Sequence, residues 1–120
     1  MDIAANVVIG LVAALHLYFL VLEMFLWRTP KGLATFGMTA EQAEATATLA
    51  ANQGLYNGFL AAGLVWALLA SEKMGEHAAL FFLGCVTVAG VYGAATVNKR
   101  ILFVQALPAV VGIVLVLAAR

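Results

Sequence analysis

Four long apolar runs, separated by short charged or turn-forming segments, constrain this chain more than any other feature. They cover residues 3–27, 49–70, 78–97 and 101–119. Each run is close to the length of about 20 residues that an α-helix needs to cross the hydrocarbon core of a membrane. Backbone groups in lipid must form hydrogen bonds within their own segment, so runs of this length are expected to be helices. We therefore predict an all-α fold, a bundle of four transmembrane helices.

The composition agrees with a chain that has lipid as its solvent. Of the 120 residues, 65% are hydrophobic and 10% are charged, and the mean hydropathy is +1.05. Soluble domains carry about 25% charged residues, and a core of this size cannot enclose so many apolar side chains. The lipid bilayer is therefore an expected partner. The formal net charge is zero and the basic residues are scattered, so no nucleic-acid partner is expected.

Local signals set the expected helix boundaries. We expect one integral membrane domain, residues 1–120, with helices at approximately 3–27, 40–70, 78–97 and 101–119. Thr39 and Gln42 fit a capping box at the start of the second helix. The first helix should end where proline, glycine and two positive charges follow Trp27, and residues 71–77 should form a charged turn.

The distribution of Lys and Arg predicts the orientation. Four of these side chains follow the first and third helices and two lie on the opposite side: Arg28, Lys31, Lys99 and Arg100 against Lys73 and Arg120. The positive-inside rule then predicts that both termini lie on the non-cytoplasmic side. The first run lacks a basic flank and exceeds the length of a signal sequence, so we interpret it as a retained helix. The expected localisation is the bacterial cytoplasmic (inner) membrane, as a multi-pass protein.

Two ionisable side chains, His16 and Glu23, interrupt the first apolar run. A charged residue at the centre of a membrane helix costs roughly 2.5–3.5 kcal/mol on insertion scales, so such residues usually have a role. The two are seven positions apart, which is two helical turns. They therefore share one side of the helix, about 10 Å apart along its axis.

Further polar side chains fall at a similar depth in the other helices. The predicted ligand-binding or proton-coupled residues are His16, Glu23, Asn52, Gln53, Tyr56, Asn57, Tyr92 and Gln105. The outer halves of the helices carry almost no polar groups, so we expect a polar cavity in the cytoplasmic half of the bundle. The alternative is structural, because amides and tyrosines in membranes often only bond to a neighbouring helix, and Glu23 can reach the interface or pair with a cation. Gly54 and Gly58 predict that another helix approaches the second helix closely, and Gly84, Gly90 and Gly93 predict the same for the third, so we expect both helices to pack tightly.

Protonatable groups define the chemistry that this cavity could support. A low dielectric favours the neutral form of a carboxyl group, which makes Glu23 a candidate proton carrier, and His16 could exchange protons with it. One His and one Glu two turns apart are too distant to bind one metal ion tightly, so no metal site is predicted. No cofactor motif is visible, and no catalytic residue is assigned. The lone cysteine, Cys85, excludes a disulfide within the chain.

Four segments resemble one known family. Residues 16–27, 52–58, 89–93 and 105–108 are similar to the bacterial membrane family catalogued as domain of unknown function 1304. The resemblance covers all four expected helices in order. It implies a small four-helix membrane protein, related to the DoxX-like group, with no established activity. It also implies that Glu23 and the cluster Asn52–Asn57 are signature residues.

Three functions are consistent with these patterns. The first is a protein that binds or transports a small amphipathic or apolar molecule in the polar cavity. The second is a membrane-embedded enzyme in which Glu23 and His16 move protons on a lipophilic substrate. The third is a structural helper subunit, or an exporter similar to the small multidrug resistance proteins, although Glu23 lies off-centre compared with their carboxylate. A homodimer is compatible with each, because 120 residues enclose only a small cavity.

Overall fold

The computed structural model describes residues 1–120, and all of its regular structure is helical. The elements are α1 (Ile3–Met24), α2 (Pro30–Phe36), α3 (Ala40–Leu69), α4 (Glu72–Thr96), the π-helical segment η1 (Leu102–Ala106) and α5 (Leu107–Ala118). The all-α prediction is confirmed. The chain divides into two compact units, the first made of residues 1–14 and 60–120 and the second of residues 15–59.

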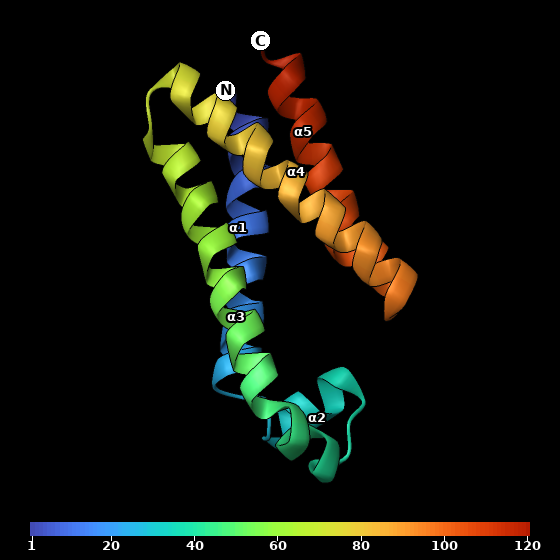
Figure 1. Cartoon of the computed structure of the whole chain (residues 1–120). Helices are drawn as coiled ribbons and strands as arrows, with labels where there is room; N and C mark the ends of the chain where they lie inside the picture. Colours follow the sequence, from blue (N-terminus) through green and yellow to red (C-terminus); the bar gives the residue numbers. More distant parts are fainter. The chain divides into compact units, whose positions relative to one another are not determined.

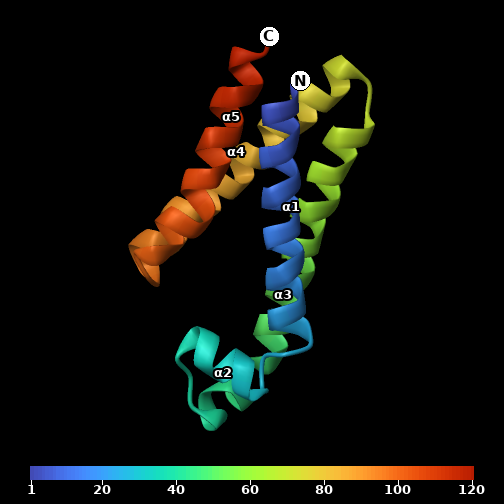
Figure 2. The same cartoon turned by 180° about the vertical axis from the view of Figure 1, so that it is seen from behind.

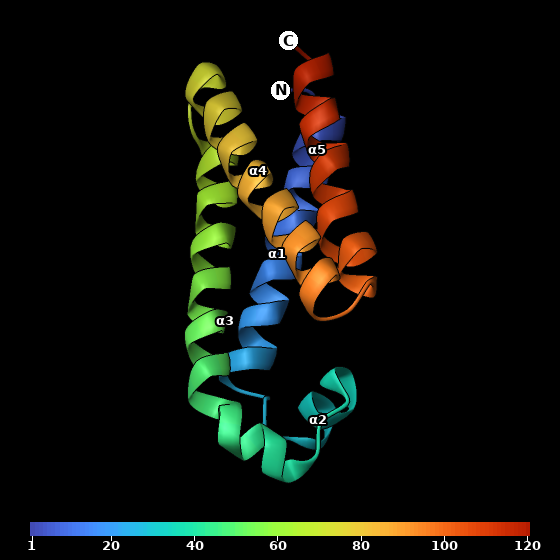
Figure 3. The same ribbon diagram turned by 45° about the vertical axis from the view of Figure 1, so that its right-hand side comes forward.

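In the first unit, α4 and α5 run side by side in opposite directions (Figure 1, Figure 3). Both chain termini belong to this unit and lie at the same end of it. Small and aliphatic side chains form its core: Ala5, Ile9, Leu64, Ala67, Ala79, Leu83, Val86, Ala109 and Val116. Small residues bring the helices close together. A Cβ at Gly90 of α4 would lie 2.6 Å from the backbone nitrogen of Ala106, so no side chain fits between the two backbones there.

The fourth apolar run is not the single α-helix that the sequence predicts. Its first part, η1, is π-helical, and the backbone N–H of Leu107 bonds to the carbonyl of Leu102, five residues earlier. Pro108 supplies a physical reason. Proline has no N–H to donate to residue 104 and its ring crowds that carbonyl, and a widened turn relieves both problems.

The charged segment 71–77, predicted as a turn, is mostly helical. α4 begins at Glu72, with Ser71 as its cap residue, six residues before the predicted start. An acidic residue in the first turn of a helix interacts favourably with the positive end of the helix dipole. The charges therefore mark the first turns of α4 instead of a break between helices.

The second unit contains the end of α1, α2 and the first part of α3 (Figure 2). Gly54 and Gly58 of α3 pack against α1. A Cβ at Gly54 would lie 2.7 Å from Cγ of Met24 and 3.0 Å from Cβ of Glu23, and a Cβ at Gly58 would lie 2.7 Å from a methyl carbon of Leu20. Close approach of another helix to this pair of glycines was predicted and is confirmed, and the approaching helix is α1.

The short helix α2 lies in the segment between the first two predicted helices, where no helix was predicted. Thr29 caps it, since the Thr29 hydroxyl accepts a hydrogen bond from the N–H of Gly32 at 3.3 Å, and Pro30 occupies its first turn. Gly37 ends it in the left-handed conformation at φ 63°. This arrangement of Thr, Pro and Gly is typical of a short helix and was present in the sequence. α1 ends at Met24, three residues before the predicted Trp27.

Two helices, α1 and α4, are long and apolar enough to cross a membrane by length and composition. The 30 residues of α3 are less apolar because Asn52, Gln53 and Asn57 lie within it. The apolar helix that ends the chain, Leu102–Ala118, is shorter than a full span. The four-span bundle, and the membrane side of each terminus, stay predictions.

Candidate functional site

Glu23 lies at a close approach of α1 and α3 in the second unit. Gly54 permits the approach, because its missing Cβ leaves room for the Glu23 side chain. Asn57, one turn further along α3, is buried and donates its amide N–H to Oε1 of Glu23. Glu23 itself is only half-buried. Its second oxygen, Oε2, accepts no hydrogen bond from the protein, so this oxygen is available to a ligand or to a proton.

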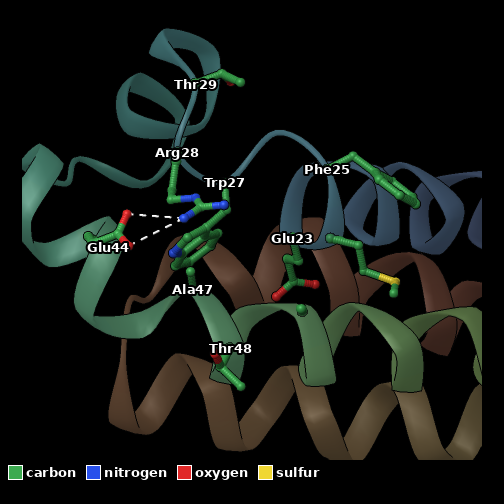
Figure 4. Close-up of a pocket in the computed structure, with 10 residues that line it drawn as sticks. Glu23, Phe25, Trp27, Arg28, Thr29, Glu44, Ala47 and Thr48 are labelled. Carbon is green, nitrogen blue, oxygen red and sulfur yellow. Dashed lines mark hydrogen bonds and ion pairs between the residues drawn. The ribbon is translucent and has the colours of Figure 1, made fainter.

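A cavity of about 550 Å³ opens beside this carboxylate (Figure 4). The end of α1 and the following turn line one side: Glu23, Met24, Phe25, Trp27, Arg28 and Thr29. The first part of α3 lines the other: Glu44, Ala47, Thr48 and Ala51. Ligand pockets in proteins typically measure about 300–1,000 Å³, so this cavity is large enough for a small organic molecule.

A chain of hydrogen bonds holds the Trp27 indole in the cavity wall. Its Nε1–H donates to the hydroxyl of Thr46 at 3.1 Å, and that hydroxyl donates to the carbonyl of Gln42 at 2.7 Å. The indole also packs against Phe36 of α2, with ring centroids 4.7 Å apart. Gln42 in turn belongs to the predicted capping box, which is confirmed: Gln42 and Thr39 exchange hydrogen bonds of 2.9 and 3.1 Å. The start of α3 therefore positions this aromatic ring.

Charge in the cavity is unevenly compensated. Nη1 of Arg28 bonds to both carboxylate oxygens of Glu44, at 3.1 and 3.3 Å. Figure 4 shows this pair joined by two dashed lines. Glu23 is the one ionisable lining residue without an oppositely charged partner in the cavity. When ionised, it gives the cavity a net negative charge.

The eight predicted site residues are distributed differently from the expectation. Glu23 is the only one that lines this cavity, and Asn57 donates a hydrogen bond to Glu23. The exposed side chains are Asn52, Gln53, Tyr56 and Tyr92. His16 is buried and has an interaction of its own, and Gln105 is partly buried. Tyr92 and Gln105 belong to the first unit, where Tyr92 lines an open apolar groove on α4 together with Phe81 and Cys85.

Sequence reasoning missed most of the cavity wall. Trp27 was predicted only as the last residue of the first helix, and Arg28 as an orientation signal or a cation that could pair with Glu23. Their partners, Thr46 and Glu44, lie 19 and 16 residues further along the chain, beyond α2. No spacing rule connects positions that far apart. The signal that could have helped was the Thr-Pro-x-Gly pattern of α2, which folds the chain back toward α3.

No group of three or more His, Cys, Asp or Glu side chains is arranged to hold a metal ion. The cavity offers instead one carboxylate, one compensated ion pair, two aromatic rings and several small side chains. This set can hold an organic molecule by contact with its apolar surface and by a single polar interaction. It contains no second titratable group beside Glu23 that is free of an ion pair.

Comparison with known proteins identifies the family to which the chain belongs. A relative, "Uncharacterized protein YpaA" of Lactococcus lactis subsp. lactis (strain IL1403), is 32% identical over 103 residues, which cover 83% of this chain and 86% of the relative. No solved structure matches the chain. The model of one family matches residues 10–117, nearly the whole sequence. The chain is therefore a member of the family described as protein of unknown function (DUF1304).

Proposed function

We propose that this protein is a multi-pass protein of the bacterial cytoplasmic (inner) membrane that binds a small amphipathic or apolar molecule in the cavity beside Glu23. Four spans would comprise α1, α3, α4 and the apolar segment that includes η1 and α5. The observation that carries the proposal is the available carboxylate oxygen of Glu23 in the wall of a 550 Å³ cavity. Relation to the DoxX-like group, and transport of the bound molecule, belong to the same proposal.

Exposed apolar side chains support the membrane location. Ile3 and Leu11 of α1 and Phe81 and Val88 of α4 are all more than 60% exposed. Soluble monomers rarely expose contiguous apolar surface of this extent, whereas lipid solvates it without cost. The two termini at one end of the first unit agree with an even number of crossings.

The length of α3 supports a cavity near the membrane surface. Its 30 residues extend over about 45 Å, which exceeds the hydrocarbon thickness of about 30 Å. The first turns of α3 contain Glu41 and Glu44, and its last turns contain Val65 and Leu69. The polar end would therefore project from the bilayer, and the cavity would lie at the boundary, where amphipathic molecules accumulate.

Glu23 would act as a protonatable contact within this site. Asn57 donates to one oxygen of the carboxyl group, and the other oxygen can bind either a proton or a polar group of the ligand. Binding would then be accompanied by proton uptake or release at Glu23. The enzyme alternative receives no support from the cavity, because His16 does not line it.

Fluorescence of Trp27 tests the proposed binding. The protein has two tryptophans, so the Trp66→Phe variant leaves Trp27 as the single indole. This variant, reconstituted in lipid nanodiscs, would be titrated with three compounds that share a phenyl ring: benzyltrimethylammonium, its uncharged isostere neopentylbenzene, and benzenesulfonate. We expect at least one to change the Trp27 emission in a saturable way.

Two cavity-filling variants provide the control. Ala47→Phe and Ala51→Phe each place a ring in the cavity from α3. Circular dichroism would confirm that both remain helical. The saturable signal should disappear in both variants. If none of the three compounds gives a saturable signal, or if filling the cavity leaves the signal intact, the proposed site is wrong.

A further inference from the structure

We propose that the ligand of the Glu23 cavity is an organic cation, with a substituted ammonium group that contacts Glu23 and the Trp27 indole and an apolar part that contacts Met24 and Phe25. This inference rests on the proposed function and specifies its ligand class. The juxtaposition that carries it is one uncompensated carboxylate and one fixed indole in the wall of the same cavity.

The charge of the cavity selects a cation. The charges of Arg28 and Glu44 compensate each other, because Nη1 of Arg28 donates to both carboxylate oxygens of Glu44. Glu23 is therefore the ionisable group of the cavity whose charge is not compensated. Asn57 contributes a neutral donor to Oε1 and so does not neutralise the carboxylate. A cation near Oε2 would supply the missing opposite charge. An anion would have to compete with Glu44 for Arg28 and would meet repulsion from Glu23.

The aromatic wall selects an organic cation over a metal ion. Indole rings attract cations through the negative face of their π-system, and they attract substituted ammonium groups without requiring hydrogen bonds. The hydrogen bond from Trp27 to Thr46 fixes the indole before the ligand arrives, so little freedom is lost on binding. A metal ion would find one free carboxylate and no cluster of three ligating side chains. Met24 and Phe25 add apolar surface for the remainder of the ligand.

The same three compounds test this inference. Benzyltrimethylammonium and neopentylbenzene have nearly the same shape and differ in charge, so the ratio of their Kd values isolates the contribution of charge. In the Trp66→Phe background we expect the cation to bind about tenfold more tightly than its uncharged isostere. In Glu23→Gln this ratio should fall to about one, while neopentylbenzene binding stays unchanged. Glu41→Gln removes an exposed carboxylate outside the cavity and should retain the full ratio.

Each other outcome contradicts a specific step. Equal binding of the cation and the isostere would overturn the cation inference and leave the proposed binding site standing. Preference for benzenesulfonate would also overturn it, and would assign the ligand to Arg28. A cation preference that survives in Glu23→Gln would show that Glu23 does not select the charge. Absence of saturable binding by all three compounds would overturn the proposed function itself, and the inference with it.

Discussion

Substitution of Gly90 by alanine tests the close approach of the α4 and η1 backbones. An added Cβ would lie 2.6 Å from the backbone nitrogen of Ala106, 2.8 Å from its Cβ and 2.9 Å from its Cα. Ordinary contacts between such atoms are about 3.5–4.0 Å, so α4 and η1 would have to separate by roughly 1 Å. Two of the three atoms belong to the backbone and cannot be moved by a change of rotamer.

The expected magnitude follows from two opposing effects. Overpacking of a well-packed contact costs about 1–3 kcal/mol, and the backbone clash places Gly90→Ala near the upper end. Replacement of glycine by alanine inside a helix recovers about 1 kcal/mol. The net loss in the free energy of unfolding should be about 1–2 kcal/mol. Gly84→Ala is the matched control in the same helix, because its added Cβ would meet nothing within 4 Å, and it should gain about 0.5–1 kcal/mol.

Thermal unfolding of both variants in detergent micelles, followed by circular dichroism, measures the difference. For a chain of this size, about 4 °C of Tm corresponds to 1 kcal/mol, so Gly90→Ala should melt roughly 6–12 °C below Gly84→Ala. The double variant Gly90→Ala with Ala106→Gly should not recover this loss, because the backbone nitrogen stays in place. Equal Tm values for the two single variants, or full recovery in the double variant, would refute the packing argument.

Two further predictions concern the second unit. Gly32→Ala would place a Cβ 2.1 Å from the carbonyl oxygen of Leu26, so α2 should unfold locally, and limited proteolysis should cleave within it while the wild-type chain stays intact. Asn57→Ala removes the hydrogen bond to Glu23 and should lower the free energy of unfolding by about 1–3 kcal/mol in thermal melts, whereas Gln53→Ala, on the exposed side of α3, should change it by less than about 0.5 kcal/mol. A loss at Gln53 as large as that at Asn57 would contradict this assignment of buried and exposed amides.

Local hydrogen-bond patterns explain which parts of the fold could be predicted from the sequence. The capping box at Thr39 and Gln42 forms as expected because its partners are three residues apart and need no other part of the chain. The caps of α2 and the π-helical turn before Pro108 are equally local, and both were legible in the sequence although the prediction did not use them. The predicted turn at residues 71–77 overestimated the power of charge to interrupt a helix, because α4 begins at Glu72. The break after the first helix is real, and α2 follows it.

The sequence by itself determined that the chain is helical and rich in apolar surface, and that Glu23 is exceptional within α1. Only the tertiary structure decided which partners Glu23 has. Asn57 is 34 residues from Glu23 along the chain, and Glu44 and Arg28, which pair in the cavity wall, are separated in sequence by α2. Apolar periodicity and capping act over a few residues, whereas the side chains that meet in a cavity depend on how helices pack. A missing Cβ at Gly54 sets that packing beside Glu23, and no rule of sequence spacing specifies which helix will fill the space.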